Sequence, residues 1–390
     1  MKLKKLTKIN LKKAENQMKN ILLKNVRFID DTVHHILLTD GKIAAIDSNL
    51  TEITADEIIE PEQDTYISAG WIDIHTHSFN KFELYGDDCD KVGYQTGVTT
   101  VVDAGTSGSD NIAEFYDEVK DKRTRVFAML NIAKPGIYAQ YELSDLANID
   151  IAKFVETTKI YKDFIVGVKA RMSSSVVGEN DVKPLELAIL AAEETELPIM
   201  VHIGNAPPKL KDVFAYLRPN DIVTHIFNPK PDGILDENGK VRPFVFEGME
   251  RGILYDVGHG TDSFGFKTYE EATKQGVQFS TISSDIYRRN RANGPVYDLA
   301  TTMSKFLLLG MDKIEIINKV TKNAAVAFHL TGLGEIKVGN TADFTFFKII
   351  NGEKELVDST GEKRMTQQYF QPVAVYLKNE FINISTNEEG

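Results

Sequence analysis

The middle of the chain alternates short apolar runs with longer amphipathic stretches. Eight of the runs have the length of buried β-strands: Trp71–Ile74, Thr99–Asp103, Arg125–Leu130, Ile165–Lys169, Ile199–Ile203, Ile222–His225, Ile253–Val257 and Gln278–Ser283. Intervening stretches such as Ile112–Lys122 and Pro184–Glu194 have the periodicity of helices. Strands that alternate with helices are typical of a parallel sheet. An open doubly wound sheet would usually carry a glycine-rich turn after its first strand, and none is present. The pattern therefore predicts an α/β fold with a (β/α)₈ TIM barrel.

Both ends of the chain show the alternation expected of short strands. Such runs occur at residues 21–28, 35–38 and 42–46, and again at 334–339, 342–347 and 372–377. Asp40-Gly41 separates two of the runs and predicts a hairpin. We therefore expect residues 19–68 and 335–390 to form a small β-sandwich domain beside a barrel over residues 69–334. Residues 1–18 are rich in lysine and are interpreted as an N-terminal extension.

A long proline-rich and glycine-rich segment, Asn228–Val245, follows the sixth predicted strand. Long loops on the carboxyl side of barrel strands are where lids and specificity elements belong. We expect this loop to border the active site.

The composition limits the classes of partner. A net charge of −12 over 390 residues argues against nucleic acid or an anionic membrane, both of which attract positive surfaces. No apolar run is long enough for a transmembrane helix. The single cysteine, Cys89, excludes an intramolecular disulfide and suits a cytoplasmic protein. A small molecule is the expected partner.

Histidines and one aspartate stand where predicted strands end. His75 and His77 are two residues apart after the first strand, His202 and His225 close the fifth and sixth, and Asp285 follows the eighth. In a barrel, all carboxyl ends of the strands converge on one pocket. Four imidazoles and a carboxylate in one pocket are the ligands of a divalent transition metal.

Lys169 ends the fourth predicted strand and should point into the same pocket. A cationic side chain beside metal ions would be repelled. A neutral amine that reacts with CO₂ to give an anionic carbamate would instead bridge two metals. A lysine paired with a carboxylate, or one extending outwards, is the structural alternative, and position alone does not separate the two.

The chain resembles the amidohydrolase superfamily. The segment Ala69–His77 is similar to the family's Gly-x-Ile-Asp-x-His-x-His motif, and residues 332–343 are similar to its return into the small β-domain. The resemblance implies two divalent metal ions, usually zinc, held by His75, His77, Lys169, His202, His225 and Asp285. It also implies a CO₂-derived carbamate on Lys169 and Asp285 as the general acid/base. Barrels of this superfamily are often multimeric, so a homo-oligomer is compatible with it.

Two metals would lower the pKa of a shared water, so the expected activity is hydrolysis by a metal-bridging hydroxide. The resemblance favours a deacetylase-like enzyme that cleaves an amide or ester of a small, carboxylate-bearing substrate. Dihydroorotases usually carry an arginine where this chain has Phe79, and adenine deaminases a Glu-Ser-Ser that is lacking. Deamination of an aminopurine and cyclic amide hydrolysis remain the alternatives.

Two further residues are predicted to bind substrate. Arg171 lies two positions after Lys169 and would clamp a carboxylate in a bidentate pair, unless it forms a salt bridge within the protein. His259, between Gly258 and Gly260, would hydrogen-bond a ligand, unless it only anchors its loop.

Overall fold

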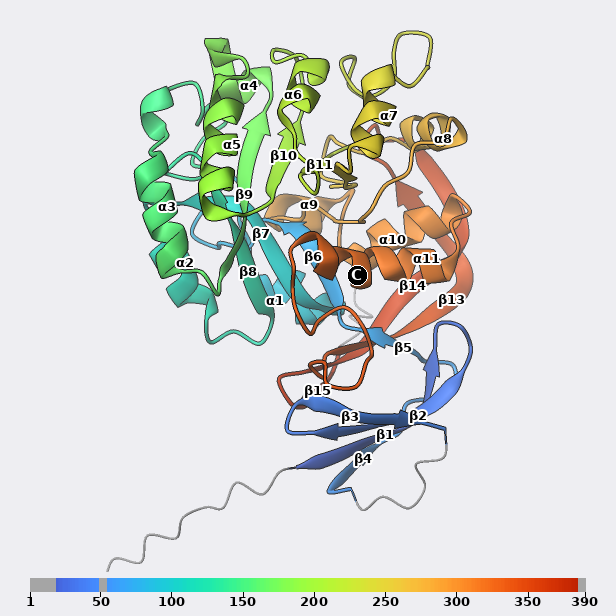
Figure 1. Ribbon diagram of the computed structural model, residues 1–390. Coiled ribbons are helices and arrows are strands. Elements are labelled where there is room, and N and C mark those ends of the chain that lie inside the picture. Colours follow the sequence, from blue (N-terminus) through green and yellow to red (C-terminus); the bar gives the residue numbers. More distant parts are fainter. Residues whose placement is uncertain (1–18, 49–54, 385–390) are drawn as a thin grey trace, which may run out of the picture.

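The computed structural model describes residues 19–48 and 55–384, which form two hydrogen-bonded sheets and the helices around them (Figure 1). One sheet is parallel and comes from the middle of the chain. The other is mixed and comes from both ends. The expected N-terminal extension, residues 1–18, lies outside the described residues.

Seven parallel strands form a TIM-like barrel wall. In spatial order, which is also chain order, they are β6 (Trp71–Thr76), β7 (Val98–Gly108), β8 (Arg125–Asn131), β9 (Ile165–Met172), β10 (Ile199–Ile203), β11 (Ile222–Thr224) and β12 (Leu254–Tyr255). The predicted fold class is confirmed. Each strand lies beside its predecessor because a helix carries the chain back between them.

The eighth predicted strand is wrong in detail. Residues 278–286 form no regular strand, and they close the barrel through single parallel bridges, Asp256 with Thr281 and Thr76 with Ile286. Ser283 and Ser284 in this segment donate their hydroxyl protons to buried carboxylates beneath the pocket. Side-chain hydrogen bonds therefore replace part of a backbone ladder there.

Helices cover the outside of the barrel. Their bounds are α1 (Cys89–Val92), α2 (Ile112–Val119), α3 (Ile151–Ile160), α4 (Ser174–Val177), α5 (Lys183–Thr195), α6 (Leu210–Tyr216), α7 (Pro243–Glu250), α8 (Phe266–Lys274), α9 (Arg288–Asn293), α10 (Leu299–Leu308), α11 (Lys313–Lys319) and α12 (Lys322–Ala327). Short 3₁₀ turns occupy Tyr94–Thr96, Leu146–Asn148 and Gly178–Asn180. Within residues 19–48 and 55–384, none of these helices has both the length and the apolar character to cross a membrane.

The two chain ends meet in one mixed sheet. Its strands are β1 (Asn20–Phe28), β2 (Val33–Thr39), β3 (Lys42–Asp47), β4 (Glu57–Ile59), β5 (Tyr66–Ala69), β13 (Phe344–Val357), β14 (Lys363–Leu377) and β15 (Glu380–Asn383). The pairing of β5 with β13 joins the N-terminal and C-terminal strands. The predicted hairpin is confirmed, with Asp40 and Gly41 both at positive φ between β2 and β3.

Aromatic packing fixes the mixed sheet against the barrel. Trp71, the first residue of β6, is fully buried, and its ring lies 5.3 Å from that of Phe347 and 6.4 Å from that of Phe370. Trp71 Nε1 also donates to Ser68 Oγ. Since β6 leads directly to His75, this contact anchors the strand that carries the first predicted metal ligand.

Candidate metal centre

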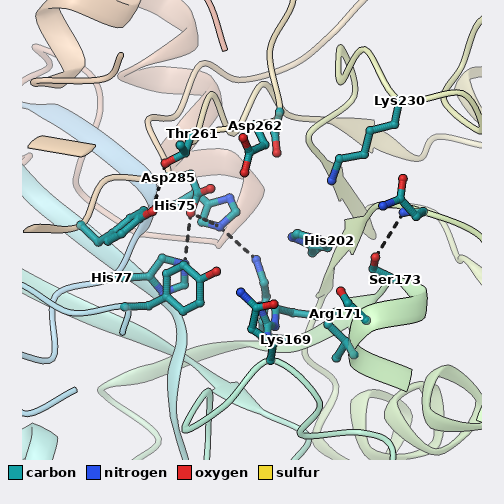
Figure 2. Close-up of a pocket in the computed structure, with 17 residues that line it drawn as sticks. His75, His77, Lys169, Arg171, Ser173, His202, Lys230, Thr261, Asp262 and Asp285 are labelled. Carbon is teal, nitrogen blue, oxygen red and sulfur yellow. Dashed lines mark hydrogen bonds and ion pairs between the residues drawn. The ribbon is translucent and has the colours of Figure 1, made fainter. Parts of the chain in front are cut away.

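Six predicted ligands lie together at the carboxyl end of the barrel. They are His75, His77, Lys169, His202, His225 and Asp285. Asp285 Oδ1 is 3.1 Å from His77 Nε2 and 3.3 Å from His75 Nε2, and Figure 2 shows these three side chains facing one another. Lys169 Nζ is 3.2 Å from His75 Nε2, and the rings of His202 and His225 are 4.5 Å apart. Ligand atoms of His75, His225 and Asp285 lie within 4.8 Å of one another, close enough for a metal ion.

A threonine fixes the orientation of His75. Thr224 Oγ1 lies 2.9 Å from His75 Nδ1 and donates its own proton to the buried carboxylate of Asp256, 2.7 Å away. Because the hydroxyl has one proton and gives it to Asp256, the imidazole Nδ1–H must be the donor to Thr224. The lone pair of His75 Nε2 is then directed into the pocket, as metal binding requires.

The same arrangement recurs on the opposite side of the site. Thr106 Oγ1 lies 2.8 Å from His77 Nδ1 and donates to Asp103 Oδ2 at 2.8 Å. His225 Nδ1 lies 2.6 Å from the carbonyl oxygen of Gly258, which can only accept. All three rings are therefore in the tautomer that leaves Nε2 without a proton. This prepared set of lone pairs is what a divalent cation needs.

The surroundings of His225 indicate whether these residues fit a metal ion. Its Nε2 is buried and has no hydrogen-bond partner in the described structure, which is rare for a buried polar atom. Burial lowers the pKa of this imidazole to about 4, and it lowers the pKa values of His75 and His202 well below the ordinary range. His75, His202 and His225 are therefore neutral at pH 7, so their lone pairs are available, and these residues fit a metal.

Lys169 is buried rather than extended outwards. Its side chain is 1% exposed, and burial is the main cause that lowers the pKa of the amine to about 7. Among the described residues, no carboxylate lies within ion-pair distance of Lys169 Nζ. A substantial fraction of this amine is therefore neutral near pH 7, the form that reacts with CO₂.

Two of the predicted ligands adopt a backbone conformation that costs energy. His225 has a φ of 66° and Asp285 a φ of 52°, a region that side chains other than glycine rarely adopt. Such residues cost about 1–3 kcal/mol each and cluster at functional sites. Gly258 leaves space beside His225, since a Cβ at this position would lie 2.1 Å from Thr224 Oγ1 and 2.8 Å from His225 Nδ1.

Arg171 lies in the pocket wall, but one edge of its guanidinium group is occupied by another side chain. Its Nε and Nη2 each donate to a carboxylate oxygen of the buried Glu142 at 2.6 Å, and Nη2 also donates to Ala139 O. This pair uses the Nε–Nη2 edge of the guanidinium group, so a substrate carboxylate could bind in a bidentate way at that edge only by displacing Glu142. Arg171 instead holds residues 139–142 against β9, and Gln140 of that segment lines the pocket.

His259 does not line the pocket. Its Nδ1 lies 2.8 Å from Gly260 O, and its Nε2 lies 2.7 Å from Nζ of Lys305, which is fully buried. Lys305 also donates to Pro295 O at 2.8 Å. Both ring nitrogens are used inside the protein, so the prediction that His259 binds substrate does not fit the structure. The histidine anchors its loop to α10.

The pocket over the ligands is lined mainly by polar groups. Besides the predicted residues it is lined by Tyr85, Gln140, Ser173, Ser175, Val176, Asn205, Lys230, Thr261, Asp262, Ser263 and Tyr287 (Figure 2). Lys230 belongs to the loop Asn228–Val245, so this loop borders the pocket that holds the predicted ligands. The sequence offered no signal for the others, because each stands on a loop or short helix whose path depends on the rest of the fold.

The whole chain has counterparts among known proteins. A family model described as a deacetylase-like composite domain matches residues 336–376. A deacetylase of Enterococcus faecalis is 46% identical over 360 residues, 92% of this chain and 97% of that protein. A solved structure of an adenine deaminase superposes with a TM-score of 0.92 at 44% identity, covering 94% of this chain and 100% of the other. A solved structure of a dihydroorotase superposes with a TM-score of 0.85 at 35% identity, covering 94% of this chain and 99% of the other. With the histidine-rich barrel pocket, these matches show that the chain belongs to the deacetylases of the amidohydrolase superfamily.

Proposed function

We propose that the protein hydrolyses an acyl amide or ester of a small, carboxylate-bearing molecule. The site would hold two divalent metal ions, with zinc as the expected metal and a carbamate on Lys169 as the bridge. The observation that carries this proposal is the set of unprotonated Nε2 atoms of His75, His77 and His225 directed at one space beside Lys169 and Asp285. When bound, the metal ions would lower the pKa of water and polarise the acyl carbonyl.

Asp285 is placed to move a proton. Its carboxylate is 17% exposed, which leaves it accessible from the pocket, and Oδ1 lies between the Nε2 atoms of His75 and His77. A carboxylate in this position can accept a proton from the attacking water and deliver it to the leaving amine or alcohol. Asn290 Nδ2 donates to the backbone oxygen of Asp285, and Asp285 N donates to His75 O, so the backbone of this residue is held on both sides.

The lining favours a small polar substrate over an aminopurine ring. Val176 is the one aliphatic side chain among the described residues that line the pocket, whereas serine, threonine, amide and charged groups dominate. The two tyrosines of the lining, Tyr85 and Tyr287, would also accept a flat ring, so the preference for a small polar substrate rests on the hydrogen-bonding groups that make up most of the rest of the lining. The relative from Enterococcus faecalis is also a deacetylase, which agrees with acyl transfer to water.

Elemental analysis of metal per chain is the first test. We expect about two metal ions in the wild type and a clear loss in Lys169→Met. Lys305→Met is the matched control, because Lys305 is equally buried and its pKa is also lowered to about 7, but it contacts no predicted ligand. One metal ion that is insensitive to Lys169→Met would contradict the bridged site.

A substrate panel is the second test. The metal-loaded protein should release carboxylic acid from N-acetyl or O-acetyl acids. Release of ammonia from aminopurines, without any acyl hydrolysis, would favour the deaminase alternative. Ring opening of cyclic amides alone would favour the dihydroorotase-like alternative.

A further inference from the structure

Lys230 brings a cation to the pocket from the loop between β11 and α7. Its side chain is half-buried and lines the pocket together with His202 and Asp262. Figure 2 shows the amine end of Lys230 reaching towards His202 and the middle of the pocket. Lys230 also interacts electrostatically with His225 and Asp285, so its charge acts on the space where acyl hydrolysis would occur.

The backbone of Lys230 is tied to the metal centre. Asn228 Nδ2 donates to the backbone oxygen of His225 at 2.8 Å, and Asn228 Oδ1 accepts from the backbone N–H of Lys230 at 3.2 Å. Gly233 N donates to Lys230 O at 3.0 Å. One buried asparagine therefore links the backbone of a predicted ligand to the backbone of this lysine and fixes the point from which its side chain extends.

The amine itself has no partner within the described residues. Neither a hydrogen bond nor an ion pair is formed by Lys230 Nζ there, and Asp262 lies beyond ion-pair distance. The other two cationic residues of the pocket are engaged, Arg171 with Glu142 and Lys169 with His75. Asp262 and Asp285 act on this partly desolvated ammonium only from beyond ion-pair distance, so an anion in direct contact with it would stabilise it.

We propose that Lys230 is the specificity-determining residue that binds the carboxylate of the substrate, because Nε and Nη2 of Arg171 are already paired with Glu142. The proposal rests on the proposed acyl hydrolysis at the same site. An ammonium is a point charge that accepts a carboxylate from several directions, so it suits a site that receives a family of small acids. Neutral analogues of the same size lose this contact.

The test compares each acetylated acid of the substrate panel with its primary amide, which has nearly the same shape and no charge. Steady-state kinetics are measured for the wild type, Lys230→Met, Lys230→Arg and Lys240→Met. Lys240 is the matched control, because it is an exposed lysine of the same loop that does not line the pocket. Thermal unfolding of each variant shows whether the fold is retained.

We expect Lys230→Met to lower kcat/KM for the acid by about 10- to 100-fold, chiefly through KM, and to change the amide by less than about threefold. Lys230→Arg should keep most of the preference for the acid, and Lys240→Met should leave it unchanged. An equal loss for acid and amide, or no loss for the acid, would overturn the role of Lys230.

Failure of the proposed function is recognised separately. If the wild type hydrolyses neither series, acyl hydrolysis is excluded, and the same acids and amides are titrated calorimetrically into the wild type and Lys230→Met. Tighter binding of the acid that is lost in Lys230→Met would still support Lys230 as the carboxylate-binding residue. Equal binding of acid and amide by the wild type would overturn it.

Discussion

Thr224 Oγ1 lies 2.9 Å from His75 Nδ1 and donates its only proton to Asp256, so a buried carboxylate controls a predicted metal ligand through one hydroxyl group. The pair comes from β6 and the end of β11, which are 149 residues apart in the chain. The relationship gives the buried carboxylates near the pocket a role, because they orient the threonines that contact the predicted histidine ligands. Asp256 accepts three hydroxyl protons, from Thr224, Thr281 and Ser283, and these bonds offset part of the rise in its pKa that burial causes.

Removal of this hydroxyl should weaken metal binding. In Thr224→Val the shape is kept, but His75 Nδ1–H loses its acceptor, so we expect metal affinity to fall by about 10- to 100-fold. Thr281→Val is the control, because Thr281 also donates to Asp256 at 2.7 Å and does not contact His75. Both variants should lose about 1–3 kcal/mol of stability. Equal metal affinity in the two variants, measured by competition with a chelating dye, would refute the role of Thr224.

Gly258 should tolerate no side chain. Gly258→Ala would place a Cβ 2.1 Å from Thr224 Oγ1 at a φ of 47°, so we expect a loss of about 3 kcal/mol and poor metal retention. Gly239→Ala has a similar φ of 73° with nothing within 4 Å, and should cost only about 1 kcal/mol. The difference between the two losses of unfolding free energy measures the cost of the steric clash at Gly258. Urea unfolding of both variants measures it, and similar losses would argue against close packing behind the ligands.

The Arg171–Glu142 pair should behave as one structural unit. Removal of either charge leaves the other buried alone, so Arg171→Met and Glu142→Leu should each cost about 3–5 kcal/mol. The double variant should recover much of this loss, which a double-mutant cycle of unfolding free energies would reveal. A coupling energy near zero would mean that the two residues act independently, and Arg171 would again be a candidate to bind substrate.

Lys305 should make stability depend on pH. Burial lowers its pKa from 10.5 to about 7, so between pH 7 and 10.5 the unfolded chain binds more protons than the folded protein. Stability must then rise with pH across this window and fall as the pH drops towards 7. Between pH 7.5 and 9.5 the metal-free wild type should gain about 2 kcal/mol more than Lys305→Met. Lys169 is present in both proteins and cancels in the comparison. If the free energies of unfolding of the two proteins changed equally with pH, Lys305 would not have a lowered pKa.

The sequence by itself determined the barrel, the hairpin at Asp40-Gly41 and the group of predicted ligands. Local patterns suffice for these features, because side chains alternate along a strand and all strands of a parallel barrel present their carboxyl ends to one pocket. His75, Lys169, His202 and His225 stand at or next to strand ends, so their convergence follows from the fold class alone.

Only the tertiary structure decided which charged groups remain available. Arg171 is occupied by Glu142, 29 residues away, and His259 by Lys305, 46 residues away. Among the described residues that line the pocket, Lys230 has the amine without a hydrogen-bond or ion-pair partner, and its loop is tied to His225 through Asn228. The partner of a buried charge is set by distances across the fold, and neither periodicity nor spacing along the chain contains them. The segment predicted as the eighth strand is irregular for the same reason, because its serine hydroxyls donate to Asp256 and Asp73, which are distant in the chain.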